Sequence, residues 1–183
     1  GKGIKAMREA GIEVSINVLE KECEELNKIF SYYVSQRLPY VMMKYAMTLD
    51  GKIATSAGQS KWITGEIARQ KVHQDRSRFM AIMIGVETLI LDDPQLSVRL
   101  ENGKNPIRII CDTHLRSPLA SKIVSTASEI STIIATAESD PEKQAPFLKA
   151  GCEIILVSYL EGRLNLKELT KKLGEKGIDS IIL

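Results

Sequence analysis

The sequence predicts an α/β fold, with a mostly parallel β-sheet that is covered by helices on both faces. Short apolar runs alternate along the chain with segments of helical periodicity, which is typical of strand–helix–strand units. One run, "PIRIICDT" at residues 106–113, lacks regular polar alternation, as expected of a strand buried on both faces. The chain has 183 residues, 44% hydrophobic and 26% charged, and is therefore long enough to bury one sizeable core.

The segment before residue 65 combines helical and extended patterns. Residues 3–10 have a helical pattern, residues 12–16 an extended one, and residues 18–36 predict one long helix. The apolar residues that recur at helical spacing in this helix are Val18, Leu19, Cys23, Leu26, Ile29, Phe30 and Tyr33. Pro39 then marks a break before "YVMMKYAMT", residues 40–48, which predicts a strand.

Helices and strands alternate regularly after residue 64. Thr64 is expected to cap a helix over residues 65–79. The side chains of this helix expected to face the sheet are Ile67, Ala68, Val72 and Phe79. A strand at 81–85 precedes a short helix that begins near Glu87 and ends before Asp92-Asp93-Pro94. The remaining predicted elements are strands at 106–113, 132–137, 153–157 and 179–183, and helices at 142–150 and 165–176.

Composition argues against several classes of protein. The net charge is +2 without a basic block, so we expect neither nucleic acid nor a membrane surface as partner. No run of about 18 apolar residues is present. Cys23, Cys111 and Cys152 lie far apart at apolar positions, which favours reduced core thiols and a cytoplasmic protein. Two histidines argue against a structural zinc site.

The loop at residues 44–64 is the first candidate site. Lys44 interrupts an apolar strand, where it is either an edge residue whose ammonium reaches water or a cation at the floor of a cleft. Asp50 belongs to an Asp-Gly turn pair, and most such pairs are only turns. Ser60 and the single tryptophan, Trp62, could offer a ligand a hydroxyl and an apolar wall. A lone Trp is nevertheless more often part of a core.

Basic residues make the helix at 65–79 and the following loop a second candidate. A solvated basic face is the plain interpretation of Arg69, His73, Arg76 and Arg78. Arg76 and Arg99 border the same loop, however, and two arginines there favour a phosphorylated ligand. The chain has no G-x-G-x-x-G and no Walker lysine loop. Residue patterns alone therefore predict an α/β domain that binds something phosphorylated.

Four longer motifs are more specific. "KYAMTLDGKIAT", "SKWIT", "VHQDRSRFMAIMIGVETLILDDPQLSVR" and "PIRIICDTHLRSP" closely resemble, in this order, the reductase domain of the bifunctional riboflavin-biosynthesis deaminase/reductase. Thr48 stands where the family usually has Ser, and Ser97 where it has Thr. Residues 1–38 resemble the end of that family's deaminase domain, without its zinc motifs, so no metal ligand is assigned. Residues 39–183 form the predicted reductase domain, and the resemblance implies that further reductase residues follow Leu183.

The resemblance implies a dihydrofolate-reductase-like, three-layer α/β/α fold. It also implies NADPH-dependent reduction of 5-amino-6-(5-phosphoribosylamino)uracil to the ribitylamino compound, with the 44–64 loop as a flap over the site. The residues it implies for NADPH are Ala46, Trp62, Thr88, Asp92 and Thr113, and those for the substrate are Ser60, Arg76, Leu96 and Arg99. Lys44 is the expected catalytic residue, with Asp50 as the other candidate proton donor.

Two other functions remain open on sequence grounds. A dihydrofolate- or pteridine-type reductase would share the fold, but a substrate without phosphate would leave Arg76 and Arg99 unexplained. A non-catalytic nucleotide-binding domain would bind NADPH without turnover. We also expect a homo-oligomer, although the sequence does not specify the number of subunits.

Overall fold

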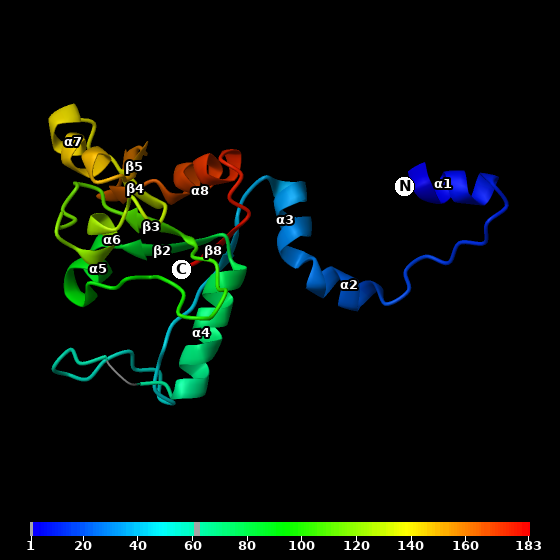
Figure 1. Ribbon diagram of the computed structural model, residues 1–183, viewed down its shortest axis with the longest axis horizontal. Helices are drawn as coiled ribbons and strands as arrows, with labels where there is room; N and C mark the ends of the chain where they lie inside the picture. Colours follow the sequence, from blue (N-terminus) through cyan, green and yellow to red (C-terminus); the bar gives the residue numbers. More distant parts are fainter. Residues whose placement is uncertain (1, 61–62) are drawn as a thin grey trace.

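A six-stranded parallel sheet forms the centre of the molecule, in a computed structural model that describes residues 2–60 and 63–183. The strand order is β1-β8-β2-β3-β4-β5, and each neighbouring pair is parallel (Figure 1). The strands are β1 (Tyr40–Met42), β2 (Ala81–Gly85), β3 (Ile107–Cys111), β4 (Thr132–Thr136), β5 (Glu153–Leu156) and β8 (Ser180–Ile182). The predicted α/β class with a mostly parallel sheet is confirmed.

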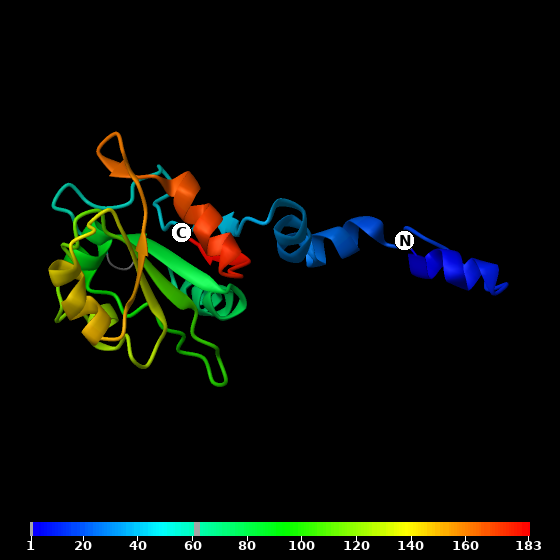
Figure 2. The ribbon, with the colours of Figure 1, turned by 90° about the horizontal axis from the view of Figure 1, so that it is seen from above.

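Helices cover both faces of this sheet, which gives the predicted three layers. The helices α5 (Val86–Asp92), α6 (Lys122–Ser125) and α7 (Pro141–Lys149) contribute Leu89, Ile123 and Phe147 to the core on one face. On the other face α8 (Leu166–Glu175) buries Leu169 and Leu173. Figure 2 shows α7 and α8 on different sides of the strands. Neighbouring residues of β3, Ile109 and Ile110, belong to opposite cores because strand side chains alternate between faces.

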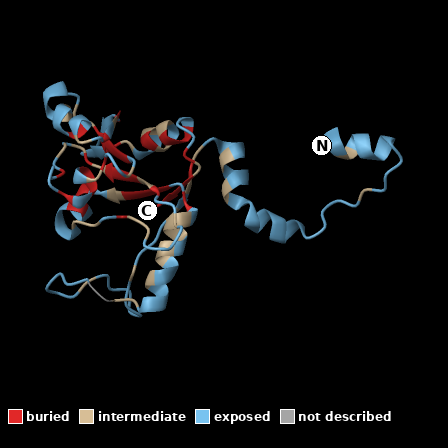
Figure 3. Cartoon of the chain, in the orientation of Figure 1, coloured by how far each residue is buried: buried red, intermediate tan, exposed pale blue. Residues whose placement is uncertain are grey.

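The chain before the sheet forms an arm that projects from the compact part (Figures 1 and 3). It contains α1 (Lys2–Glu9), α2 (Glu20–Leu26) and α3 (Lys28–Gln36), none of which has a buried residue. The predicted long helix over 18–36 is divided at Asn27, whose side-chain amide donates to the Cys23 carbonyl (2.9 Å) and so ends the first helix. No extended strand forms at 12–16.

Among the described residues, the hydrogen bond and apolar contacts between the arm and the compact part come from α3. The Tyr33 hydroxyl donates to the carbonyl of Gly174 in α8 (2.9 Å). A side chain at Gly174 would collide with the Arg37 carbonyl, because a Cβ there would lie 2.3 Å from that oxygen. Gly174 is therefore needed for the close approach of the arm to α8.

The predicted strand at 40–48 is correct only for its first residues. β1 ends at Met42, where its single partner β8 also ends, and one further hydrogen bond joins the Lys44 amide to the Leu183 carbonyl (2.8 Å). Lys44 is therefore exposed and outside the strand, in contrast to the expected position inside it. The backbone beyond has no adjacent strand to hold it extended.

The helix expected at 65–79 is present as α4 (Glu66–Arg78), but its packing was wrongly predicted. It has no buried residue, and Ile67 is 85% exposed instead of facing the sheet. Phe79, just after the helix, is the buried anchor. Gly65 occupies the N-cap position without a side-chain cap, so the expected cap from Thr64 is absent.

Two elements were not predicted: α6, which is only four residues long, and a hairpin of β6 (Tyr159–Leu160) and β7 (Arg163–Leu164).

The cysteine prediction was partly wrong. Cys152 is buried and Cys111 half-buried, whereas Cys23 is exposed on the arm, and all three are free thiols. In the described part of the chain, no helix has both the length and the apolar character needed to cross a membrane.

Candidate active site

The C-terminal edge of the sheet brings together the loops that follow β2 and β3. The parallel register sets Gly85 beside Cys111, so both loops leave the sheet at the same level. Ligands of open α/β sheets bind beyond this edge. After β2, α5 begins directly, anchored by the buried Val86 and Leu89, and this leaves Thr88 exposed on its outer side.

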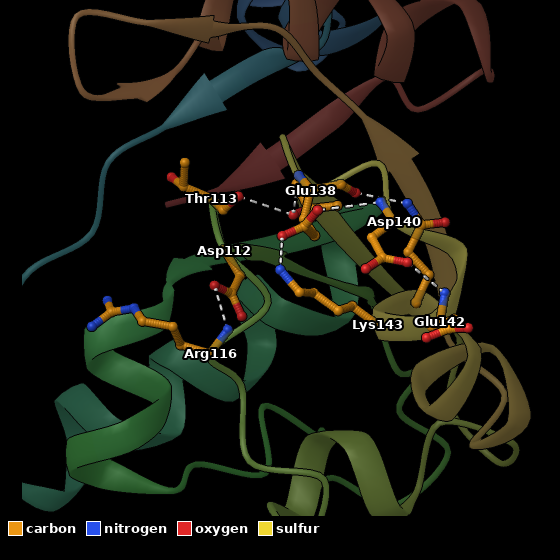
Figure 4. Close-up of polar contacts among 9 residues, drawn as sticks. Asp112, Thr113, Arg116, Glu138, Asp140, Glu142 and Lys143 are labelled. Carbon is orange, nitrogen blue, oxygen red and sulfur yellow. Dashed lines mark hydrogen bonds and ion pairs between the residues drawn. The ribbon is translucent and has the colours of Figure 1, made fainter.

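Asp112 organises the loop after β3. It is fully buried, and its carboxylate accepts a hydrogen bond from the Arg116 amide (2.9 Å; Figure 4). The same carboxylate accepts from the Ser117 amide and hydroxyl (both 2.7 Å). Three donors compensate the burial of this carboxylate. The loop at 113–117 is therefore held in one conformation, with Thr113 at its start.

Thr113 is also tied to the neighbouring strand. Its carbonyl oxygen accepts from the Thr136 hydroxyl and from the Ala137 amide, both at 3.1 Å. Thr113, a predicted cofactor contact, is half-buried at the sheet edge, one strand from Thr88. Thr88, in the first turn of α5, and Thr113, in the loop after β3, thus follow two adjacent strands.

A charged group beyond β4 was not found from the sequence. Lys143 of α7 pairs with Glu138 (Nζ to Oε2, 2.6 Å), and the Lys143 hydrogen bond holds the pKa of Glu138 below its usual value. Asp140 caps α7 by accepting from the Glu142 amide (2.9 Å). The segment Asp140-Pro141-Glu142 is a helix-start pattern, so sequence reasoning could have placed this cap.

A second pair missed by the sequence links the loops after β2 and β3. The Arg116 guanidinium contacts the Glu87 carboxylate in the first turn of α5. The hydrogen bond that Arg116 donates to Glu87 raises the pKa of Arg116. Both side chains are exposed, and they lie 29 positions apart in sequence, so no local pattern could have indicated the contact.

The predicted substrate residues Arg76 and Arg99 come together around His73. Arg76 Nη1 donates to the Ser97 carbonyl (3.3 Å), and the Arg99 amide donates to His73 Nδ1 (3.3 Å). The pKa of Arg76 is lowered mainly by burial and also by the charge of Arg99. The pKa of His73 is lowered mainly by burial and also by the charges of Arg76 and Arg99. Positive charge is therefore concentrated here.

One donor of Arg76 has no partner. Its Nε is buried, yet it makes no hydrogen bond to any of the described residues. A buried unpaired donor of a cation is costly, and an anion is the ligand that would remove the cost. Leu96, also predicted to touch the substrate, is buried in the same loop with a positive φ of 54°.

The two acidic residues at the end of α5, Asp92 and Asp93, make different contacts. Asp93 adopts a left-handed conformation that ends the helix and accepts from the Lys122 amide (2.8 Å). Asp92, the predicted cofactor contact, is exposed, and its carboxylate makes no hydrogen bond or ion pair within residues 2–60 and 63–183. The helix therefore ends at Asp92, one residue later than predicted.

The 44–64 loop lies apart from both groups. It runs from β1 to the start of α4, and nearly all of its described residues are exposed or half-buried (Figure 3). Asp50 is ionised readily, because hydrogen bonds from Thr48 and then Lys52 lower its pKa. No hydrogen bond or ion pair of the described residues connects Lys44, Asp50 or Ser60 with the arginines or with Thr88 and Thr113.

Two further predicted cofactor contacts, Ala46 and Trp62, belong to this loop. Ala46 is half-buried, and Trp62 lies outside the described residues. No cluster of His, Cys, Asp or Glu that could hold a metal ion occurs in the described ranges.

Comparison with known proteins gives a consistent match. The RibD C-terminal domain family matches residues 39–183. Riboflavin biosynthesis protein RibD of Actinobacillus pleuropneumoniae is 48% identical over 183 residues, covering 100% of this chain and 49% of the relative. The RibD protein of Aquifex aeolicus is 43% identical, covering 96% of this chain and 48% of the relative. The chain thus spans about half the length of the curated relatives it matches.

Solved structures show the same similarity. The crystal structure of a diaminohydroxyphosphoribosylaminopyrimidine deaminase/5-amino-6-(5-phosphoribosylamino)uracil reductase from Thermotoga maritima matches with a TM-score of 0.83 at 34% identity. The match covers 100% of this chain and 49% of that one. The Saccharomyces riboflavin biosynthesis reductase Rib7 matches with a TM-score of 0.60 at 19% identity, over 87% of this chain and 71% of that one, which shows the fold.

Proposed function

Because the chain belongs to the RibD C-terminal domain family, we propose that it carries out the reductase step of riboflavin biosynthesis. The reaction is the reduction of 5-amino-6-(5-phosphoribosylamino)uracil to 5-amino-6-(5-phosphoribitylamino)uracil, with NADPH as reductant. The observation that supports it most strongly is the pair of cations Arg76 and Arg99 beside His73, in which the Arg76 Nε is buried and unpaired among the described residues.

The phosphate of the substrate is the natural ligand of this group. Arg76 is half-buried and fixed by its bond to the Ser97 carbonyl, so little side-chain freedom is lost on binding. The exposed Arg99 can approach from the other side of the same loop. A guanidinium binds phosphate through two parallel N–H bonds, which gives both charge and direction. Leu96 and Ser60 are the other residues that we assign to the substrate.

The cofactor site fits a nicotinamide dinucleotide at the C-terminal edge of the sheet. Thr88 of α5 and Thr113 of the loop after β3 carry hydroxyl groups beyond two adjacent strands, and Asp112 keeps the loop after β3 rigid. We assign Ala46, Asp92 and Trp62 to the same ligand. When bound, the cofactor supplies the hydride that reduces C1′ of the opened sugar.

Lys44 is the proposed catalytic residue. Its backbone amide is held by Leu183 beside the edge of the sheet, while its side chain is exposed. The nitrogen of the opened sugar gains electron density during reduction, and an ammonium at this point stabilises it or gives it a proton. Asp50 is a weaker candidate donor, because its lowered pKa favours the ionised form.

The N-terminal arm has a proposed origin. We assign residues 1–38 to the end of a deaminase domain and residues 39–183 to the reductase domain. The Thermotoga deaminase/reductase matches the whole chain, arm included, which supports this division. The expected homo-oligomer and the cytoplasmic location remain predictions.

The phosphate assignment can be tested by titration. We expect Arg76→Ala and Arg99→Ala each to weaken binding of the phosphorylated substrate by roughly 1.5–3 kcal/mol, the range of a charged hydrogen bond, with NADPH affinity unchanged. The measurement is calorimetry with the substrate and with its dephosphorylated form. Arg163→Ala, an exposed arginine of the β6–β7 hairpin, serves as control.

The dephosphorylated compound makes the test specific. It should bind the parent chain and both variants with the same reduced affinity, since it lacks the group that the arginines recognise. Unchanged affinity of both variants for the phosphorylated substrate contradicts the proposal. NADPH binding without any turnover, in a chain that also binds the substrate, favours the non-catalytic alternative.

A further inference from the structure

One face of α4 holds the loop that joins α5 to β3. Three residues form this face, His73, Arg76 and Ser77, because residues three and four positions apart are neighbours on a helix surface. All three are half-buried, whereas Gln74, next to His73 in sequence, is exposed. Each of the three bonds to the backbone of the loop. The loop that carries Arg99 is therefore attached to α4 by side chains of the helix.

Two of these bonds hold the two sides of the turn at residues 100–103. On one side the Arg99 amide donates to His73 Nδ1 (3.3 Å). On the other side the Lys104 amide donates to the Ser77 hydroxyl (3.1 Å). Within the described ranges, His73 is thus the side chain that fixes the Arg99 backbone.

The loop is closed on itself between these anchors. The Val98 amide donates to Asn105 Oδ1 (2.8 Å), and the Gly103 amide donates to the Leu100 carbonyl (3.0 Å). A Cβ at Gly103 would collide with Val98 Cγ1, so the two sides of the turn are in direct contact. The turn therefore behaves as one unit, and its position relative to Arg76 depends on the bonds to α4.

We infer that His73 is a positioning residue of the substrate site, which sets the place of Arg99 by accepting its backbone amide. The inference rests on the proposed function, in which Arg76 and Arg99 bind the substrate phosphate. Arg76 belongs to α4 and Arg99 to the loop, so the distance between the two guanidinium groups depends on how the loop lies on the helix. His73 fixes this relation before the ligand arrives, which lowers the cost of ordering the site on binding.

The chemistry of an imidazole suits this role. His73 can accept the bond only as a neutral ring whose proton is on Nε2. Burial, together with the charges of Arg76 and Arg99, lowers its pKa, so the neutral form is the one present near pH 7. A lysine or arginine at this position could not accept a bond. His73 thus orients Arg99 as an uncharged group and leaves the negative charge of the ligand to the two arginines.

Two substitutions of nearly equal shape separate an acceptor from an apolar group. In asparagine Oδ1 is bonded to Cγ, as Nδ1 is in histidine, so His73→Asn keeps an acceptor at this point, whereas His73→Leu places a methyl group there. For His73→Leu we expect the 183-residue chain to bind 5-amino-6-(5-phosphoribosylamino)uracil roughly 3- to 10-fold more weakly in calorimetry, the range of one hydrogen bond. His73→Asn should stay within about twofold of the parent chain. The dephosphorylated compound should bind all three chains alike.

The order of the two variants distinguishes positioning from a merely structural effect. Leucine is a better helix former than asparagine, so damage to α4 would make His73→Asn the weaker binder. Gln74→Leu changes the exposed neighbour of His73 on the same helix and is the matched control, which should alter none of the affinities. Circular dichroism of each variant checks its helix content.

A double-mutant cycle tests whether His73 acts through Arg99. In an Arg99→Ala background, His73→Leu should change the affinity for the phosphorylated substrate by less than about twofold, since the guanidinium that it positions is gone. The full loss in that background would mean that His73 contacts the phosphate itself, and it would overturn the inference.

The outcomes separate this inference from the proposed function. If Arg99→Ala weakens binding and His73→Leu does not, or if His73→Asn binds more weakly than His73→Leu, the positioning role is wrong while the phosphate assignment stands. If neither Arg76→Ala nor Arg99→Ala weakens binding of the phosphorylated substrate, the phosphate assignment fails and the inference fails with it. A loss in His73→Leu that is restored in His73→Asn, and that disappears without the Arg99 guanidinium, supports both.

Discussion

Three arginines show how one residue type takes three roles in this chain. Arg108 is 1% exposed, and its guanidinium donates to Ile123, Ile130 and Thr132 acceptors at 2.7–3.0 Å, so it is a structural group. Arg76 is half-buried and keeps an unpaired Nε, which suits a ligand. Arg116 is exposed and forms an ion pair with the Glu87 carboxylate at the surface. Hydrogen-bond satisfaction, more than burial alone, distinguishes these roles.

Lys44 supports a prediction at the same scale. We expect Lys44→Met to lower turnover by about 10²–10⁴-fold, the usual contribution of a positioned acid or base, because the nitrogen would lose its proton source. NADPH affinity should stay nearly the same. Steady-state kinetics with NADPH oxidation as readout measure the first quantity, and calorimetry the second.

A lysine of the same loop provides the control. Lys52 is exposed and paired with Asp50 at 3.0 Å, so Lys52→Met should leave turnover close to that of the parent. Near-normal turnover of Lys44→Met would make Lys44 an ordinary exposed lysine. The proton would then have to come from Asp50 or from water.

At the scale of elements, Arg108 explains how the short helix α6 is held. Four residues cannot form a stable helix alone. The Arg108 Nη2 bonds to the carbonyls of Ile123 and Thr126 (3.0 and 3.1 Å) cover the end of this helix from β3. Arg108 also donates to the Ile130 carbonyl and the Thr132 hydroxyl, which lie just before and at the start of β4. One side chain thus joins β3, α6 and β4.

We expect Arg108→Met to lower the free energy of unfolding by about 3 kcal/mol, because several buried carbonyls would lose their donor at once. Urea denaturation measures the change. Arg163→Met, on the exposed hairpin, should alter stability by less than about 0.5 kcal/mol. A similar small effect of Arg108→Met would show that the carbonyls find other partners.

At the scale of the whole molecule, the arm and the compact part differ in packing. The three helices of the arm have no buried residue, whereas the sheet buries side chains on both faces. Exposed apolar residues such as Leu26 and Phe30 remain on the arm. Segments with few buried contacts open at low free-energy cost.

Limited trypsin digestion should therefore cut the arm first, at Arg8 and Lys21, and leave a resistant fragment that begins near Arg37. Mass spectrometry of the time course identifies the cuts. The internal control is Lys171 in α8, which is exposed but lies in a helix that buries two leucines. Equal rates at Lys21 and Lys171 contradict the expectation. Protection of Lys21 that disappears on dilution would indicate that a second copy covers the arm.

The sequence by itself determined the class of the fold and most of its elements. Short apolar runs without alternation indicated strands buried on both faces, and the Asp92-Asp93-Pro94 break predicted the end of α5 to within one residue. Four ordered motifs also indicated the family, together with its site residues. These signals are local in the sense that each lies within one continuous segment of the sequence.

Only the tertiary structure decided which distant residues meet. The contacts of Glu87 with Arg116 and of Arg108 with the end of α6 depend on how separate elements pack, which no local pattern encodes. The early end of β1 and the exposed face of α4 were missed for the same reason. A strand needs a partner, and an apolar helix face needs a surface to cover, and both are supplied by other parts of the fold.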